Sequence, residues 1–231
     1  MSRGVAARLA ACLIAAFPGT AGACALQLVL AMDVSGSINA REHALQTGGL
    51  AAAFESEALA NAVAALEGGM LVTFTQWSGG SRQRQMTSWR KVTKPEHLRA
   101  FAAEIRAAPR EWRNFSTAIG EALLHAELVS RGAPLPCLRR VIDVSGDGVS
   151  NEGRPPRAIA DGLEAQGFTV NGLVIRGADP DPVEHYLSEV IAGPGAFVEV
   201  AEDFEDYPRA ILRKLLREID QPMMVSEAPP Q

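Results

Sequence analysis

The chain has 231 residues, of which 47% are hydrophobic and 21% are charged, and its formal net charge is −5. This length and composition fit one domain of ordinary size with a sizeable apolar core. The acidic balance argues against nucleic acid or an anionic membrane surface as a partner, because either would need a basic patch.

The first 23 residues have the pattern of a secretory signal peptide. Arg3 and Arg8 form a positive start, Leu9–Phe17 an apolar core, and Ala21–Ala23 a small-residue cleavage signal. The apolar run is too short for a transmembrane helix. Removal of this segment would change the net charge from −5 to −7, because it holds two arginines and no acidic residue.

We therefore expect an exported protein, periplasmic or secreted, with no later transmembrane segment. Residues 24–220 are expected to form one domain and residues 221–231 a flexible C-terminal tail. The minority alternative is a lipoprotein anchored at Cys24, although Ala21 stands where lipoprotein signals usually have leucine.

The first element predicted for the mature chain is a buried strand that ends in polar residues. Leu28–Met32 is apolar without alternation, which is typical of a parallel strand buried on both faces. Asp33, Ser35 and Ser37 follow at its carboxyl end, the edge at which open α/β sheets bind ligands. One carboxylate and two hydroxyls favour a hard cation such as Mg²⁺ over Zn²⁺.

Strands and helices then alternate along the chain. Apolar runs and period-two patterns predict strands, and one-sided apolar spacing or an early proline predicts helices. Strands are expected over residues 70–77, 138–145, 168–175 and 196–200, with an antiparallel edge strand over 83–89. Helices are expected over residues 40–57, 94–106, 155–167, 182–191 and 204–219. This alternation favours a doubly wound, mostly parallel α/β sheet with helices on both faces.

Two later segments place further oxygen ligands at similar positions. Thr117 lies where a loop opens the next helix, and Asp147 lies where the apolar strand from Val141 runs into a turn. Each has a simpler interpretation as well. Thr117 could only cap its helix, and Asp147 with Gly148 is a common turn pair.

With these three segments in this order, the chain resembles the von Willebrand factor A (VWA) domains over nearly its whole length after residue 23. Asp33-x-Ser35-x-Ser37 is similar to the metal-ion-dependent adhesion site (MIDAS) of that family, which a threonine and a second aspartate from later loops complete. The resemblance implies that Thr117 and Asp147 are those two residues. It also implies a six-stranded Rossmann-like sheet and Mg²⁺, or Mn²⁺, as the cofactor. The stretch over residues 140–148 most resembles uncharacterised secreted bacterial VWA proteins.

The family resemblance also implies a disulfide. If the two strands are parallel neighbours, as in the family, Cys24 and Cys137 lie together at the end of the sheet opposite the metal. They precede Asp33 and Asp147 by nine and ten residues. A disulfide there suits an exported protein.

The resemblance implies adhesion as the function. Two carboxylates only balance a divalent ion, and five side chains leave part of an octahedral Mg²⁺ shell to water or to a partner oxygen. We therefore expect a domain that engages an acidic residue of a protein partner. A structural or assembly factor with a purely stabilising metal site and, less favoured, a metal-dependent hydrolase stay open as alternatives.

An enzymatic function is disfavoured because the sequence lacks the residues and motifs that the common hydrolase and nucleotide-binding mechanisms require. Ser35 stands where Asp-x-Asp phosphotransfer hydrolases have their general acid, and a serine cannot protonate a leaving group at neutral pH. G-x-S-x-G, H-E-x-x-H and Walker glycine patterns are absent from the sequence.

Two further features are interpreted from residue type and position. Trp112 and Arg113 precede Thr117 and are candidates for the rim of the site, because Trp and Arg are common binding hot spots. Trp112 could equally pack beneath its loop. Asp143 lies inside an apolar strand, where a lone carboxylate is costly, and Arg139 or a serine could pair with it.

Overall fold

β1 (Cys24–Asp33) lies in the middle of a seven-stranded sheet, and all ten of its residues are buried. The computed structural model describes residues 24–221. β1 pairs in parallel with β2 (Met70–Trp77) and β5 (Cys137–Gly146), and β6 (Phe168–Ile175) and β7 (Val198–Ala201) extend the parallel sheet beyond β5. The strand order is β3-β2-β1-β5-β6-β7, with β4 also paired to β2.

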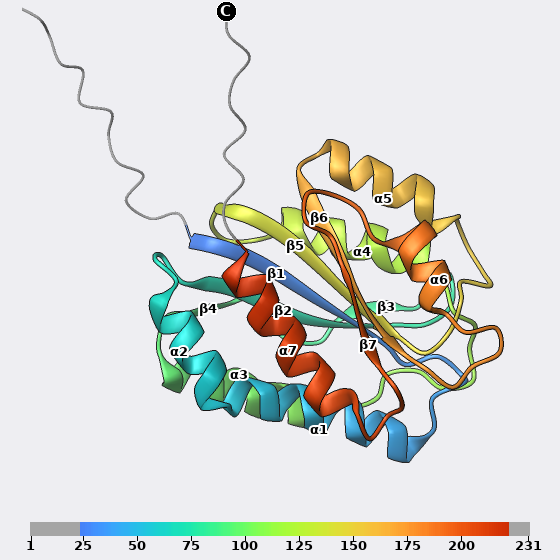
Figure 1. Ribbon diagram of the computed structural model, residues 1–231, viewed down its shortest axis with the longest axis horizontal. Helices are drawn as coiled ribbons and strands as arrows, with labels where there is room; N and C mark the ends of the chain where they lie inside the picture. The colour runs from blue at the N-terminus through green and yellow to red at the C-terminus, as the bar shows by residue number, and fades with distance from the viewer. Residues whose placement is uncertain (1–23, 222–231) are drawn as a thin grey trace, which may run out of the picture.

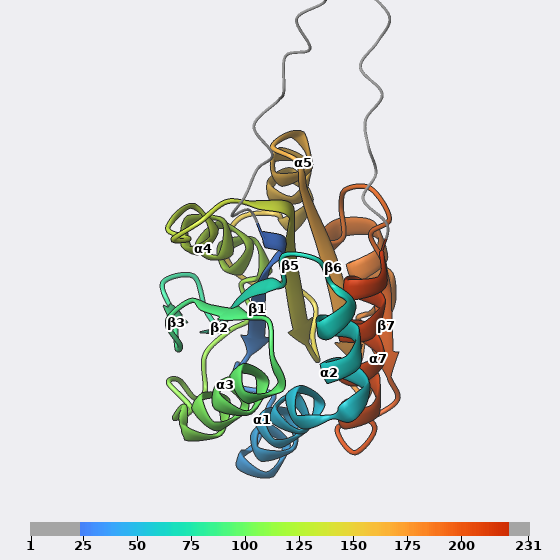
Figure 2. The same cartoon turned by 90° about the vertical axis from the view of Figure 1, so that its left-hand side faces the viewer.

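Helices cover both faces of this sheet (Figures 1 and 2). One face packs against α1 (Ala40–Glu55), α2 (Glu57–Ala65), α3 (Pro95–Ala107) and α7 (Tyr207–Asp220). The other packs against α4 (Ile119–Arg131), α5 (Pro156–Ala165) and the π-helical turn η1 (Tyr186–Val190), which follows the short α6 (Val183–His185). Each face has its own apolar cluster, so the predicted doubly wound, mostly parallel α/β architecture is confirmed.

The structure differs from the sequence-based elements at the edge of the sheet and at the end of the first helix. The edge strand expected over 83–89 is the shorter β3 (Gln83–Gln85), and β4 (Arg90–Val92), which follows it, was not predicted. Both are antiparallel to β2, so the sheet has seven strands and not six. The helix expected over 40–57 ends at Glu55, because Ser56 caps both that helix and the next. Its N–H donates to the Ala53 carbonyl, and its hydroxyl accepts from the N–H of Leu59 to begin α2, which was not predicted.

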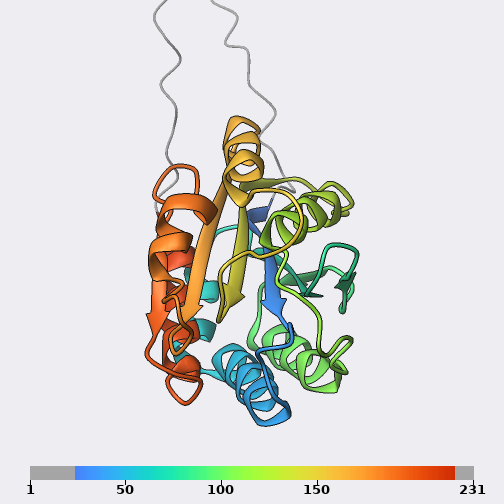
Figure 3. The same ribbon diagram turned by 90° about the vertical axis from the view of Figure 1, so that its right-hand side faces the viewer.

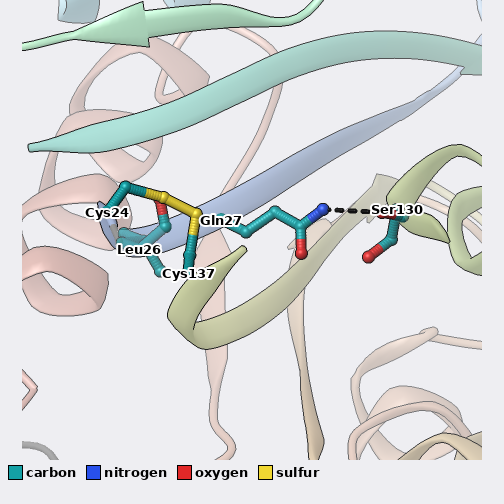
Figure 4. The surroundings of a disulfide bond; sticks show 5 residues. All are labelled: Cys24, Leu26, Gln27, Ser130 and Cys137. Atoms are coloured by element: carbon teal, nitrogen blue, oxygen red, sulfur yellow. Dashed lines mark hydrogen bonds between the residues drawn. A yellow bond between two sulfur atoms is a disulfide. The ribbon is translucent and has the colours of Figure 1, made fainter. Parts of the chain in front are cut away.

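The predicted disulfide is present at the amino end of β1 (Figure 4). Cys24 lies directly opposite Cys137 in the register of β1 and β5, with the Cα atoms 4.4 Å apart. Nearby, the buried Gln27 side chain donates to the Ser130 carbonyl at 2.8 Å and ties β1 to the end of α4. A Cys24 sulfur held in a disulfide is not free to form the thioether of a lipoprotein, which argues against that alternative.

The membrane and terminal predictions are tested only in part. Within residues 24–221, no helix is both long and apolar enough to cross a membrane. The signal peptide expected over 1–23 lies outside the described residues, as does the expected tail from residue 222 onward.

Candidate metal centre

The carboxyl ends of β1, β5 and β6 point to the same edge of the sheet, where β1 leads into α1 (Figure 3). Asp33 is the last residue of β1 and is fully buried there. Its Oδ1 accepts a hydrogen bond from the backbone N–H of Ser35 at 2.7 Å. Its Oδ2 is also buried but has no hydrogen-bond partner among residues 24–221. Since a buried carboxylate oxygen without a partner is costly, this atom indicates a place for a cation.

Ser37 joins the loop after β1 to the loop after β5. Its hydroxyl donates to Asp147 Oδ1 at 2.8 Å, and it lies 3.3 Å from the hydroxyl of Ser35. Ser35 is fully buried and Asp147 is 7% exposed, whereas Ser37 is exposed. The site therefore has a buried floor and opens to solvent on the side of Ser37.

Thr117 is supplied by the loop that precedes α4. Its N–H donates to Asn151 Oδ1 at 2.9 Å, and its carbonyl accepts from the N–H of Asn151 at 2.8 Å. A Cβ placed on Gly148 would lie 3.9 Å from the Thr117 hydroxyl oxygen, which puts that oxygen beside the loop carrying Asp147. The same loop touches the first segment, because the Gly36 N–H donates to the Phe115 carbonyl at 2.8 Å.

Thr117 does not cap α4, so the simpler interpretation of its hydroxyl is wrong. The N-cap position is Ala118, and the Ser150 hydroxyl accepts the hydrogen bond from the Ile119 N–H at 3.2 Å. The Thr117 side chain, which is 6% exposed, is left for another role.

The electrostatics of the site favour a positive ligand. Burial raises the pKa of Asp33 to about 8, and the charge of Asp147 adds to the rise, while hydrogen bonds from Ser35 and the charge of Arg110 oppose it. Burial also raises the pKa of Asp147, against the hydrogen bond from Ser37. The positive charges of the protein therefore do not offset the cost of ionising these two buried carboxyl groups. A divalent cation between them would favour their ionised forms.

Arg110 supports the turn that carries Asp33 and Ser35. This role was not predicted from the sequence. Arg110 Nη2 donates to the carbonyls of Val34 at 3.1 Å and Ser35 at 2.9 Å, which fixes the turn that carries the first ligands. Nothing in its local sequence marks this role. Asn151, which holds the Thr117 loop, was likewise missed because its contacts are to backbone atoms.

Tyr186 is a third residue that sequence reasoning missed. Its ring comes from η1 and is fully buried, and its hydroxyl has no hydrogen-bond partner among the described residues. A Cβ on Gly146 would lie 2.7 Å from that hydroxyl and 2.9 Å from Asp33 Oδ2. A glycine is thus required at position 146 to let both groups approach the end of β5.

The set of donors fits a hard divalent cation. The five predicted side chains contribute two carboxylates and three hydroxyls, all oxygen, as Mg²⁺ and Mn²⁺ prefer. Within residues 24–221, no cluster of three or more His, Cys, Asp or Glu residues with metal-binding geometry is present, so a nitrogen- or sulfur-rich site is not formed there.

The rim residues are placed as follows. Trp112 is half-buried and Arg113 is exposed. In the loop that carries them, the N–H of the preceding Glu111 donates to Gln76 Oε1 at 2.9 Å. Further along, the exposed ring of Phe115 is covered by the Arg82 guanidinium, with 3.6 Å between the guanidinium carbon and the ring centre. An aromatic and cationic surface thus borders the loop that leads to Thr117.

The doubly wound sheet with a central β1, and polar side chains beyond its carboxyl end, is a fold that this chain shares with several solved structures, among them a von Willebrand factor type A protein from Catenulispora acidiphila at 13% identity, with a TM-score of 0.59 over 85% of this chain and 43% of that chain. Proximal thread matrix protein 1 (PTMP1) from the mussel byssus matches with a TM-score of 0.62 at 19% identity, over 85% of this chain and 49% of that protein. Pilus adhesin SpaC from Lactobacillus rhamnosus GG matches with 0.60 at 14% identity, over 85% of this chain and 31% of that chain. A further PTMP1 structure, with 19% identity, a TM-score of 0.60 and coverage of 85% and 48%, is described as having a zinc-occupied MIDAS motif.

These likenesses establish the fold. This chain spans about half the length of PTMP1 and about a third of the length of SpaC. Residues 23–223 match the family model described as "Protein of unknown function (DUF1194)", and the chain belongs to that family. No curated protein matches the chain in sequence.

Proposed function

We propose that this protein is an exported binding domain that uses one divalent cation, Mg²⁺ or Mn²⁺, to engage an acidic residue of a protein partner. Asp33, Ser35, Ser37, Thr117 and Asp147 would hold the cation, directly or through water. The observation that carries the proposal is the hydrogen bond from Ser37 to Asp147, which joins the loops after β1 and β5, together with the buried Oδ2 of Asp33, which has no partner among residues 24–221.

Charge and coordination explain why a partner carboxylate would be accepted. The two aspartates balance the charge of the ion, and the hydroxyls of Ser35, Ser37 and Thr117 are neutral. A third carboxylate can therefore approach the ion, because the ion and its ligands together carry no net negative charge. Mg²⁺ has six ligands and keeps several of its waters, so an incoming carboxylate can replace a water on the exposed side of Ser37.

The structural neighbours support the proposal at the level of the class. The zinc-occupied MIDAS motif of PTMP1 supports a divalent metal at the equivalent edge of this sheet. SpaC, described as a pilus adhesin, supports a role in adhesion. Export is supported by the disulfide and by the signal peptide expected over 1–23, with a periplasmic or a secreted location equally compatible.

A binding role is preferred to catalysis because of what surrounds the serines. Ser35 contacts Ser37, and Ser37 contacts Asp147, so neither hydroxyl is paired with a histidine base in the described structure. A metal-dependent hydrolase would instead be revealed by turnover of phosphate esters or peptides.

The proposal is tested by calorimetric titration of the mature protein with Mg²⁺ and with Mn²⁺. Asp33→Ala is expected to abolish binding. Asp220→Ala is the matched control, because Asp220 is an exposed aspartate at the far end of α7. Metal affinity that survives Asp33→Ala would contradict the assignment.

A purely stabilising ion is the second candidate, and the full burial of Asp33 and Ser35 favours it. Capture of partners from the source organism's cell envelope, with and without EDTA, separates the two roles. Adhesion predicts that the chelator abolishes capture. A stabilising ion predicts a lower melting temperature with capture unchanged.

A further inference from the structure

Lys214 is a fully buried lysine in the contact between α7 and the sheet, on the face opposite η1. Its Nζ lies 2.7 Å from Asp143 Oδ1 on β5 and 2.6 Å from Glu218 Oε1, one turn further along α7. Side-chain exposure is 0% for Lys214, 2% for Asp143 and 0% for Glu218. These contacts answer the question of what accompanies Asp143: it is Lys214, not Arg139, whose guanidinium instead donates to the Glu218 carbonyl at 2.8 Å.

Neighbouring residues hold Glu218 in place beside the amine. Asn171 is the cross-strand neighbour of Asp143 on β6, and its Nδ2 donates to Glu218 Oε1 at 3.0 Å. The orientation of Asn171 is itself fixed, because its Oδ1 accepts from the N–H of Phe197 at 3.2 Å. The ring of Phe197 lies 5.5 Å from Lys214 Nζ and helps to close the cluster from solvent.

The cluster is poorly satisfied as a set of ions. Two carboxylates share one amine in a dry interior, and Glu218 Oε2 has no hydrogen-bond partner in the part of the chain that the structure describes. Lys214 Nζ is close to Asp143 Oδ1 but is not aligned for a hydrogen bond, so both Asp143 oxygens also lack one. Burial raises the pKa of Asp143 to about 7, with the charge of Lys214 opposing the rise and that of Glu218 adding to it. A neutral acid beside a desolvated amine is thus accessible near neutral pH.

A water-sized space adjoins the acid. A cavity of about 10 Å³, close to the room that one water requires, is lined by Asp143, Ser145 and Tyr207 among others. Bulk water is otherwise excluded, since the three reacting side chains are buried.

We propose that Lys214 and Asp143 condense within the folded protein to an amide that covalently joins α7 to β5, with Glu218 as the group that transfers the proton. This modification is independent of the proposed metal site. Three features of the cluster favour the reaction: an amine held against a carboxyl group, a second carboxylate on the amine, and exclusion of water that would reverse it.

The step balances without any further reactant. Lys214 Nζ first passes one proton to the Asp143 carboxylate beside it. The lone pair of the resulting amine attacks Cγ of the Asp143 carboxyl group, and the C–N bond forms as one amine proton passes to the Glu218 carboxylate. Glu218 then gives that proton to the departing hydroxyl, the C–O bond breaks, and one water is released. Glu218 returns to its starting form, and no electron is gained or lost.

The experiment is intact-mass measurement of the mature protein after denaturation and reduction. The expected mass is lower than that of the sequence by one water. Fragmentation of a digest must then recover a single cross-linked peptide pair containing Asp143 and Lys214. This second readout is needed because cyclisation of Asp147 onto the Gly148 nitrogen would also remove one water, but within one peptide.

Two matched variants test the chemistry. Glu218→Gln preserves the shape of the side chain but removes the proton acceptor, so the full mass is expected. Asp143→Asn is expected to lose ammonia if it condenses, in place of water. Full mass in the unaltered protein, with the β5 and α7 peptides recovered separately, would mean that the cluster is an ion pair only and would overturn the proposal.

Discussion

Cys24 and Cys137 occupy directly opposed register positions on β1 and β5, at the end of the sheet away from Asp33 and Asp147. The two strands are therefore fastened covalently at one end, while the other end presents the polar loops. The disulfide fixes the strand pair from which the ligand loops begin, but it does not contact those loops.

This arrangement predicts that the disulfide contributes to stability and not to metal affinity. Its sequence separation is 113 residues, and for a loop of that length the chain-entropy model gives an upper value of about 4 to 5 kcal/mol. Cys24→Ser combined with Cys137→Ser should lower the free energy of unfolding by up to that amount, as measured by chemical denaturation. Mg²⁺ affinity, measured by calorimetry on the folded variant, should stay within about twofold, a change that corresponds to less than about 0.5 kcal/mol. A large loss of affinity would show that the two ends of β1 are coupled.

The hydroxyl of Thr117 is predicted to be a ligand group and not a structural one. Thr117→Val keeps the shape of the side chain but removes its oxygen, whereas Thr117→Ser keeps the oxygen. We expect Thr117→Val to weaken Mg²⁺ binding by at least about tenfold, the lower bound for loss of a group that supports a metal site. Thr117→Ser should bind nearly as tightly as the unaltered protein. Equal affinity of all three proteins in calorimetry would remove Thr117 from the site.

Asp33 makes the stability of the metal-free protein depend on pH. Its pKa is about 8 in the folded protein and about 4 in an unfolded chain, so the folded state retains a proton that the unfolded state has lost between those values. Stability in EDTA should therefore be highest near the lower value and fall as pH rises toward 8, by at most about 1.4 kcal/mol per pH unit for one group. Added Mg²⁺ should oppose this fall, because it favours the ionised carboxylate.

Asp33→Asn isolates this effect in melting curves recorded from pH 5 to 9 in EDTA. The variant cannot lose the proton, so its curve should be flatter than that of the unaltered protein. Asp143 cancels from the comparison in either state: as a free carboxyl group, whose pKa burial raises to about 7, it contributes in the same direction in both proteins, and as the proposed amide it does not titrate in either. Parallel curves would show that Asp33 does not titrate in this range.

The sequence predicted the fold, and it placed the loop after Asp33 beside that of Asp147, as the contact of Ser37 with Asp147 shows, because both depend on strong local signals. That these residues bind a metal stays a prediction. The apolar runs of β1, β5 and β6 require burial on both faces, and polar residues at their carboxyl ends must meet at one edge. The supporting contacts carry no such signal. Arg110 acts on two backbone carbonyls, and Tyr186 reaches the site only because of the packing of η1.

Lys214 shows a different limit of sequence reasoning. A lysine in an amphipathic helix is usually assigned to the exposed face, yet this one is buried because Asp143 and Glu218 accompany it. Its partner Asp143 was recognised as anomalous from the apolar strand around it. The residue that accompanies Asp143 is set by how α7 packs across the sheet, and no local sequence pattern encodes this packing.

The last prediction concerns selectivity for the partner, which the metal alone cannot supply because any exposed carboxylate could approach it. Trp112 is half-buried in the loop before Thr117, and among the described residues it is not part of either apolar cluster. We therefore expect Trp112→Ala to weaken partner binding by about 2 kcal/mol or more, as for an aromatic hot spot, with metal affinity unchanged. Trp89→Ala is the matched control, because Trp89 packs against the cluster beneath α4 and its truncation should mainly lower stability. Partner affinity is measured by calorimetry in Mg²⁺ once the partner has been captured, and stability by chemical denaturation. If Trp112→Ala instead lowers stability by about 3 to 5 kcal/mol, the cost of truncating a buried aromatic side chain, Trp112 packs beneath its loop and the rim role is wrong.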